Sequence, residues 1–299
     1  MVVSKKVRSL HRKKALAAYL IILPAAALII IFKVVPVLAA MLRSLFDYHI
    51  LKPEEMHFTG LANYFKVFGD PVFFKSLRTT FVFAAGKIVL QLLPAFFLAL
   101  FLQRKRKGVG IVRSFILIPT ATSLVVVSVI WGLLYDPNNG LFNSILAVLG
   151  LPQLKYFTSA KQALSSLLVM MIWKDMGFIT IIYLAGLQDI PAAFYEAATV
   201  DGAGALTKLW RITLPLLKRT TVFLVIITTI WSFQVFTPVY INTKGGPQYS
   251  TNVLVYYIFE RGFIRMEMGY ALAMSVILFF IIMVIGIIQN RLIRADFEY

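Results

Sequence analysis

Long, uninterrupted blocks of apolar residues limit what this chain can fold into. Six such blocks occur, at about 15–40, 79–102, 114–135, 163–187, 220–241 and 269–289. A helix of about 20 residues, rising about 1.5 Å per residue, crosses the ~30 Å hydrocarbon core of a bilayer. Only 14% of the residues are charged, against about a quarter in a soluble domain. The sequence therefore predicts an all-α integral membrane protein with six transmembrane helices inside a transmembrane domain over 15–293.

Basic residues are distributed unevenly between the two sides of these spans. If the basic tail 1–14 lies in the cytoplasm, that side carries seventeen Lys and Arg residues, whereas the longer loops opposite carry ten. The positive-inside rule then predicts that both termini, including residues 294–299, are cytoplasmic. The net charge of +17 favours this orientation and contact with anionic lipid over binding of nucleic acid, because the basic residues flank the spans.

The sequence offers no set of residues for catalysis or metal binding. It has no cysteine, and its three histidines, His11, His49 and His57, lack the spacing of metal ligands. No GxxxxGK[ST] phosphate-binding loop occurs, so ATP hydrolysis by this chain is not expected. We expect a non-catalytic protein with no catalytic residue, no metal and no cofactor of its own.

Polar and aromatic residues inside the spans are candidates for a solute path, because polar groups in lipid usually have a function. In the fifth span, four residues recur at i, i+3, i+4 and i+7 and share one helix face: Thr228, Trp231, Ser232 and Val235. In the fourth span, a further group lies near mid-membrane depth: Trp173, Asp175, Met176 and Phe178. Aromatic faces suit the C–H side of a sugar ring, and hydroxyl and carboxylate groups suit its hydroxyls. The alternative is that these residues only pack helices together.

Lys33 lies near an end of the first span and can snorkel to the interface, whereas Lys87, Lys174 and Asp175 are charged residues deep inside spans. These three are expected to point into the protein, because a charge facing lipid is strongly unfavourable. Asp175 has two possible roles, contact with a solute or neutralisation of Lys87 or Lys174, and the sequence leaves both open.

The segment 188–219, between the fourth and fifth spans, differs from a plain connection. Asp189 is predicted to cap a helix over 192–200, whose residues favour helix strongly. Gly202 is predicted to form a sharp turn, and a second helix follows over 205–212. A helix, a turn and a helix with small side chains form a rigid surface that another protein can approach closely.

These residues resemble the EAA loop of the permeases of ATP-binding-cassette (ABC) importers. The resemblance is carried by Glu196-Ala197-Ala198, Asp201-Gly202-Ala203 and Ile212-Thr213-Leu214-Pro215. It implies a type I ABC importer permease fold, in which this loop couples to a separate subunit that binds ATP and Mg²⁺. Other stretches, among them YLAGLQDIP and SFQVFTPVYINTKGGP, are similar to the carbohydrate-type permeases for maltose, glycerol 3-phosphate and multiple sugars.

The resemblance implies a permease subunit that moves a sugar, an oligosaccharide or a sugar-like solute inward by alternating access. It implies the cytoplasmic membrane of a bacterium or archaeon, and it places the candidate residues of the fourth and fifth spans along the path. The implied partners are a second homologous permease in a heterodimer, two ABC ATPase subunits and an extracytoplasmic solute-binding protein. The alternative is an ion-coupled secondary carrier, which needs intramembrane carboxylates, and Asp175 is its only candidate.

Overall fold

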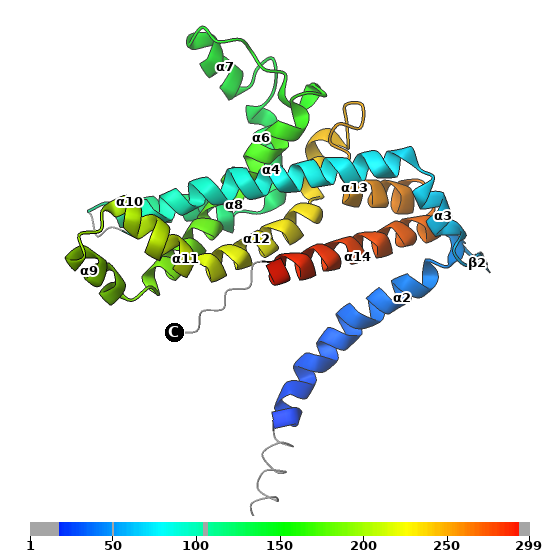
Figure 1. Cartoon of the computed structure of the whole chain (residues 1–299). Helices are drawn as coiled ribbons and strands as arrows, with labels where there is room; N and C mark the ends of the chain where they lie inside the picture. The colour runs from blue at the N-terminus through cyan, green and yellow to red at the C-terminus, as the bar shows by residue number, and fades with distance from the viewer. Residues whose placement is uncertain (1–17, 50, 104–106, 293–299) are drawn as a thin grey trace, which may run out of the picture. The chain divides into compact units, whose positions relative to one another are not determined.

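A computed structural model of the chain describes residues 18–49, 51–103 and 107–292 (Figure 1). The described part is mostly helical, as predicted, and contains one two-stranded hairpin. The predicted basic tail 1–14 and C-terminal segment 294–299 lie outside the described residues. The chain divides into two compact units, residues 1–67 with 261–276 and residues 68–260 with 277–299.

The first unit begins with an apolar helix that is not covered by the rest of the chain. It runs over Ala18–Arg43, through the π-turn η1 (Ile30–Val34) and α2 (Val35–Arg43), and its most apolar window is 0% buried. Pro36 lies in the first turn of α2, where its missing N–H accounts for the local change in helix type. Such a helix needs lipid or a partner protein around it.

A short hairpin is an addition to the predicted all-α fold. β1 (Phe46–His49) pairs antiparallel with β2 (Lys52–Phe58), and α3 (Ala62–Phe68) follows. Asn63 of α3 is buried, and its Nδ2 donates to the carbonyls of Ser44 and Phe46, both at 2.9 Å. The hairpin sequence lacks a regular alternation of apolar and polar residues, so periodicity does not predict it.

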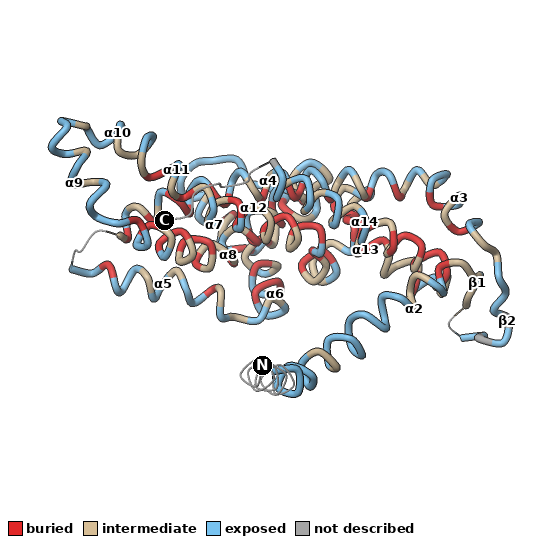
Figure 2. Tube along the Cα trace, turned by 60° about the horizontal axis from the view of Figure 1, so that its bottom comes forward, coloured by how far each residue is buried: buried red, intermediate tan, exposed pale blue. Residues whose placement is uncertain are grey.

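Three long helices lie side by side in the second unit: α4 (Pro71–Leu102), α8 (Ala163–Gln188) and α12 (Lys218–Phe233) (Figure 1). α14 (Met268–Leu292) begins in the first unit and continues in the second. Buried residues form stripes along these helices (Figure 2). Many of the exposed side chains are large and apolar. An apolar outer surface is expected where lipid is the solvent.

The remaining helical segments are shorter than these four. They are α5 (Val109–Ala121), α6 (Leu124–Leu134), α7 (Leu141–Val148), η2 (Tyr156–Thr158), α9 (Ala192–Val200), α10 (Ala205–Lys208), η3 (Leu209–Thr213), α11 (Leu214–Leu216), η4 (Val239–Thr243), α13 (Leu254–Phe259) and η5 (Glu260–Ile264).

Within the described residues, four helices are long and apolar enough to cross a membrane, and up to six spans result if each of two bent helix pairs counts as one. The four are Ala18–Arg43, Pro71–Leu102, Ala163–Gln188 and Met268–Arg291. They coincide with four of the six predicted blocks. The other two blocks, 114–135 and 220–241, are not single helices.

The block 114–135 is broken at Thr122, where α5 and α6 meet at 100°. Pro119 weakens the last turn of α5, and Thr122 has an extended backbone. Lys174 Nζ of α8 donates to the Thr120 carbonyl at 2.9 Å, and Thr120 Oγ1 donates to the Lys174 carbonyl at 3.3 Å. Lys174 thus points into the protein, as predicted, and supplies a donor to a carbonyl that the end of α5 leaves unpaired.

The block 220–241 corresponds to α12, which ends earlier than predicted, at Phe233. Pro238 precedes η4 and lacks the N–H that an α-helix continuing through this point would need. At its other end, α12 makes an angle of 61° with the helical stretch Ala205–Leu216.

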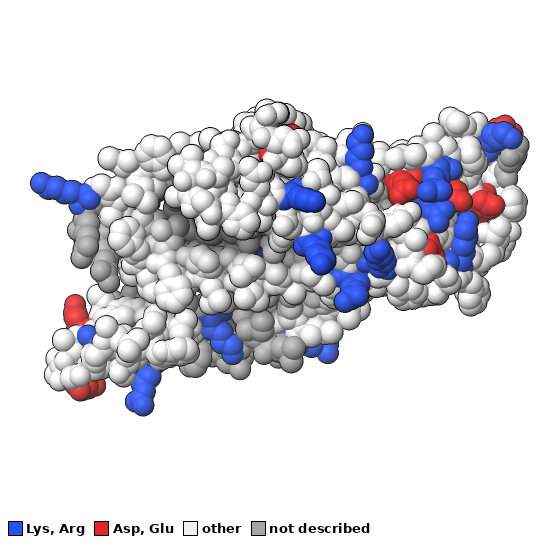
Figure 3. All heavy atoms as spheres, turned by 90° about the horizontal axis from the view of Figure 1, so that it is seen from above, with Lys and Arg blue, Asp and Glu red and all other residues white. Residues whose placement is uncertain are grey.

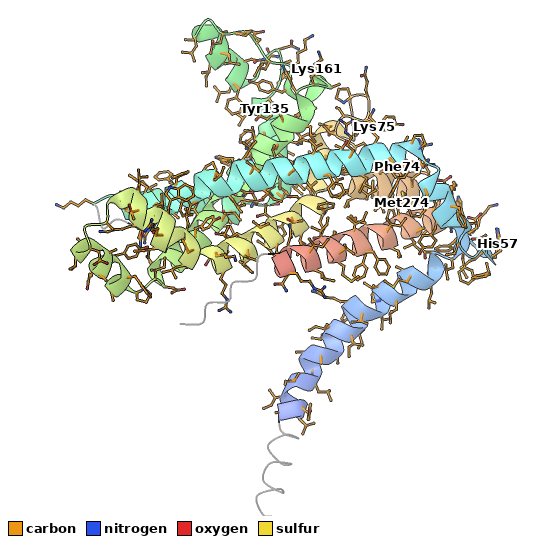
Figure 4. All side chains as sticks on the ribbon, viewed as in Figure 1. His57, Phe74, Lys75, Tyr135, Lys161 and Met274 are labelled. Atoms are coloured by element: carbon orange, nitrogen blue, oxygen red, sulfur yellow. The ribbon has the colours of Figure 1, made fainter. Side chains whose placement is uncertain are left out.

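Aromatic rings fix α7 against α6. Tyr135, at the end of α6 (Figure 4), stacks on Tyr156 with ring centroids 4.3 Å apart. Phe142 of α7 lies 5.2 Å from Tyr135 and 5.6 Å from Trp131 of α6, again between centroids. Each such pair contributes about 0.5–1.5 kcal/mol beyond burial. The pair α6–α7 therefore projects from the bundle as one body (Figure 1).

Candidate functional site

A lobe made by α9, α10 and η3 follows α8 at one end of the bundle (Figure 1). The predicted helix, turn and helix are confirmed, and Gly202 makes the turn with φ +74°, which favours glycine. The predicted cap is wrong. α8 continues to Gln188, so Asp189 is its C-cap residue, and Pro191 occupies the N-cap position of α9 without a side-chain hydrogen bond.

Side-chain hydrogen bonds brace the α9–α10 lobe internally. The Tyr195 hydroxyl of α9 lies 3.0 Å from the Thr213 hydroxyl of η3. Lys208 Nζ of α10 donates to Thr199 Oγ1 of α9 at 2.8 Å. Because these bonds join the first helix of the lobe to the second, they favour a single arrangement of the two.

The nine residues predicted for coupling all lie on or directly after this lobe. Five are exposed: Glu196, Ala197, Asp201, Gly202 and Pro215. The other four are half-buried: Ala198, Ala203, Ile212 and Leu214. The structure thus brings the predicted motif together at one end of the second unit, with its two charged members, Glu196 and Asp201, accessible.

Exposed apolar side chains on the lobe were missed by sequence reasoning. Val200 is 89% exposed, Leu206 71%, Trp210 68% and Phe194 45%. They share the lobe with acidic and basic side chains (Figure 3, lower left). The sequence does contain a sign of this surface, because large apolar residues occur on the short helices α9 and α10, which are too short to bury them. Exposed apolar groups with a charged rim are typical of a protein-binding surface.

Two cavities lie at the base of the lobe, away from the predicted path residues. One, of about 630 Å³, lies between the end of α4 and the lobe and is lined by residues that include Leu100, Tyr195 and Leu206. Another, of about 500 Å³, is lined by residues of α8, α11 and α12 that include Asp189 and Arg219. Neither is lined by a residue predicted for the solute path.

A smaller cavity, of about 280 Å³, does collect path residues from α8 and from the end of α12. Of the predicted residues, Asp175, Trp231 and Val235 line it. Its other lining residues are Leu124, Met171, Gln234, Phe236 and Thr237. Gln234, Phe236 and Thr237 follow the end of α12 at Phe233, where its helical periodicity stops. Leu124 of α6 and Met171 of α8 are apolar residues within apolar spans, so the sequence does not single them out.

Asp175 forms an ion pair beside this cavity. Its Oδ2 lies 2.6 Å from Lys87 Nζ of α4, and the Lys87 side chain is 0% exposed. The Asp175 carboxylate is therefore neutralised by Lys87 and not by Lys174, which is one of the two roles that the sequence left open for Asp175. Lys87 Nζ also lies 6.0 Å from the centre of the Trp231 ring, and Phe178 packs on that ring with centroids 5.0 Å apart.

Other predicted path residues lie outside the cavity lining. Trp173 packs on Trp131 with ring centroids 5.4 Å apart, which places it with the aromatic rings of α6. Thr228 and Ser232 are both 0% exposed, and Ser232 Oγ donates to the Thr228 carbonyl at 2.6 Å. Trp173, Thr228 and Ser232 thus occupy helix-packing positions, which is the alternative considered for them.

The fold, the lobe and the polar cavity define an ABC transporter permease. The chain belongs to the family of binding-protein-dependent transport system inner membrane components, whose family model matches residues 87–295.

The chain is similar to known permeases over nearly the whole length of each protein. The trehalose/maltose transport system permease protein MalF of Thermococcus litoralis is 32% identical over 288 residues, which are 95% of this chain and 96% of that protein. The sn-glycerol-3-phosphate transport system permease protein UgpA of Yersinia pestis is 30% identical over 284 residues, 94% of this chain and 95% of that protein. The probable ABC transporter permease protein YurN of Bacillus subtilis is 31% identical over 284 residues, 94% of this chain and 97% of that protein.

A solved structure has the same fold. A chain of the bacterial alginate ABC transporter in complex with alginate pentasaccharide-bound periplasmic protein superposes with a TM-score of 0.82, over 96% of this chain and 98% of that chain, at 22% identity. The predicted permease fold is confirmed by this match and by the family.

Proposed function

We propose that this chain is the non-catalytic membrane subunit of an ATP-driven importer that moves a sugar or sugar-like solute inward. The observation that carries the proposal is the accessible α9–α10 lobe with its exposed apolar side chains and Glu196. α8 leads directly into the lobe, and the lobe leads through α11 into α12. A motor protein bound there therefore acts on both helices that line the polar cavity.

The lobe is built to transmit a displacement. Its internal bonds, Tyr195 to Thr213 and Lys208 to Thr199, resist deformation when a partner pulls on it. ATP and Mg²⁺ belong to that partner. Among the residues that the structure describes, no group of three or more His, Asp or Glu side chains is placed to hold a metal ion. Alternating access follows if movement of α8 and α12 opens the cavity first to one side and then to the other.

The cavity has the chemistry of a saccharide site. Trp231 offers an aromatic face for the C–H side of a sugar ring. Asp175, Gln234 and Thr237 offer oxygen and nitrogen atoms that pair with hydroxyl groups. The relatives named for trehalose and maltose and for glycerol 3-phosphate support a polyhydroxylated solute.

Further partners follow from the same surfaces. A second homologous permease would complete a heterodimer and, with lipid, would cover the apolar helix Ala18–Arg43, which the rest of its own chain leaves unburied. Two ABC ATPases would bind the two lobes of that pair. An extracytoplasmic solute-binding protein would deliver the solute, in line with the periplasmic protein bound to the alginate transporter.

The lobe is placed on the cytoplasmic side of a bacterial or archaeal inner membrane. Lys208, Arg211, Lys218 and Arg219 lie in or next to it, and basic residues favour the cytoplasm. With six spans, counting α5–α6 as one and α12 as another, both termini are on that side as well.

An ion-coupled carrier is the weaker alternative. It would use Asp175 to carry a proton or a sodium ion across the membrane. The ion pair with Lys87 at 2.6 Å already compensates that carboxylate. A compensated carboxylate has little tendency to take up a cation, so this observation favours the ATP-driven importer.

Reconstitution tests the proposal. Vesicles carrying this chain, its partner permease and their ATPase are expected to take up solute from the loaded binding protein only when ATP is present. A protonophore and a sodium ionophore should leave that uptake unchanged. Transport by this chain without the ATPase, or collapse of uptake with the ion gradient, would overturn it.

A further inference from the structure

The ion pair between Lys87 and Asp175 is asymmetric with respect to the cavity. The Lys87 side chain is 0% exposed, whereas that of Asp175 is 15% exposed. Asp175 lines the cavity and Lys87 does not. The pair therefore presents its negative end to the space where a solute would sit and keeps its positive end inside the protein.

Stability alone is a poor explanation for such a pair. Removing two charges from water is unfavourable, and replacing a buried ion pair by apolar residues of similar size is often neutral or stabilising. α4 and α8 have extensive apolar contacts in addition, including Leu92, Phe96 and Leu184 in one buried cluster. The pair makes better sense as the means of holding an ionised carboxylate at the cavity wall.

The rest of the lining adds no positive charge. The eight described residues that line the cavity include Asp175 but no lysine, arginine or histidine. A solute with a carboxylate or phosphate would leave water for a wall that presents only the negative end of an ion pair and offers no cation, which is unfavourable. An uncharged sugar meets the opposite situation, because its hydroxyls donate to Asp175 and its C–H face covers Trp231.

We infer that this cavity selects uncharged saccharides over sugar acids and sugar phosphates, with Asp175 as the hydroxyl acceptor and Lys87 as the residue that positions it. The inference rests on the proposed function and narrows its solute class. Lys87 also lies 6.0 Å from the Trp231 ring centre, so the same ammonium group helps to orient both the carboxylate and the aromatic wall.

Exchanging the two charges provides the test. The double variant Lys87→Asp/Asp175→Lys keeps an ion pair between α4 and α8 but turns its positive end toward the cavity. Binding is measured by isothermal titration calorimetry on the assembled transporter in nanodiscs. The probes are glucose, maltose and trehalose, with glucuronate, glucose 6-phosphate and trehalose 6-phosphate as anionic counterparts.

The wild-type protein is expected to bind at least one neutral probe at least about tenfold more tightly than its anionic counterparts, because a charge-assisted hydrogen bond is gained and a repulsion is avoided. The exchanged variant is expected to lose that preference or to reverse it. A pair that only stabilises the fold would leave the preference unchanged, and this result would overturn the inference. Preference for an anionic probe in the wild type, or no binding of any probe, would also overturn it.

A second variant covers the case in which the exchanged protein does not assemble. Lys87→Met/Asp175→Asn removes both charges and leaves an amide at the cavity wall. It is expected to assemble, to bind the neutral probe about tenfold more weakly and to lose discrimination against the anionic one. Wild-type selectivity in this variant would contradict the inference. ATP-driven uptake by the wild type is measured in parallel, so a wrong charge preference with intact ATP-driven uptake refutes this inference and leaves the proposed function standing.

Discussion

Gly177 of α8 lies where α8 and α5 approach each other closely. A Cβ added there would lie 2.0 Å from the carbonyl oxygen of Ile116 and 2.9 Å from Thr120 Oγ1. Carbon–oxygen contacts between helices usually lie at about 3.3–3.6 Å. The Ile116 atom belongs to the backbone, so no side-chain rotation can relieve the overlap. Gly177→Ala is therefore expected to move α5 away from α8 by about 1 Å or more.

The expected loss of stability has two parts. Overpacking of a tight contact destabilises by about 1–3 kcal/mol. Displacement of α5 also weakens the bond from Lys174 Nζ to the Thr120 carbonyl, now 2.9 Å, and an unsatisfied buried polar group adds about 1–3 kcal/mol. Alanine favours helix over glycine by about 1 kcal/mol, which offsets part of this. The net destabilisation of Gly177→Ala is about 1–5 kcal/mol.

Thermal unfolding of the purified permease pair in detergent measures this effect. Gly110→Ala is the matched control, because Gly110 lies on α5 and an added Cβ would meet nothing within 4 Å. The control should melt at or slightly above the wild-type temperature, and Gly177→Ala clearly below it. If the two variants melted together, the close approach of α5 and α8 would be refuted.

Three further substitutions test the lobe and the cavity. Glu196→Lys reverses an exposed charge of the proposed docking surface. It should leave the transporter assembled but lower ATP-driven uptake about tenfold through weaker ATPase binding. Uptake equal to that of the wild type would show that Glu196 is not part of the docking surface. Trp231→Ala should weaken solute affinity by about 2- to 10-fold, measured by titration calorimetry. Trp173→Ala is the control and should leave the affinity unchanged, because Trp173 lies outside the cavity lining. Equal effects of the two substitutions would place the solute elsewhere. Gly202→Val should lower the coupling of ATP hydrolysis to uptake, because valine at φ +74° is strained by about 1–2 kcal/mol. Gly204→Val is the control and should be tolerated, because Gly204 has φ −69° and an added Cβ meets nothing within 4 Å. Equal coupling in both variants would contradict the role of the turn.

The long helices of this protein follow from composition, but its broken helix does not. Apolar residues continue through 114–135, so hydropathy predicts one span there. Pro119 is a local sign of the break, but the donor for the Thr120 carbonyl is Lys174, on a helix about fifty residues further along the chain. A contact of that kind is tertiary, and no local pattern contains it. By contrast, the turn at Gly202 was predictable because the backbone conformation itself requires glycine.

Helical periodicity identified only Trp231 and Val235 among the eight described residues that line the cavity, for a related reason. A spacing of i, i+3, i+4 and i+7 groups residues on one face, but it does not say whether that face meets a cavity or another helix. Trp231 meets the cavity, whereas Thr228 and Ser232, on the same face, are packed inside the protein. Gln234 and Thr237 line the cavity from beyond the end of α12, where periodicity no longer applies.

Two adjacent residues of α8 join it to α5 and α4. Lys174 bonds to Thr120 at the end of α5, and Asp175 bonds to Lys87 of α4. Such polar bonds are strong and directional where water is scarce, so α4, α5 and α8 should move together. α12 also packs on α4, where the rings of Phe81 and Phe233 lie 5.0 Å apart between centroids, and Gln289 Nε2 of α14 donates to Thr229 Oγ1 of α12 at 2.8 Å. Because α8 and α12 both contribute to the cavity lining, movement of α4, α5 and α8 relative to α12 would change the shape of the cavity, as the proposed transport requires.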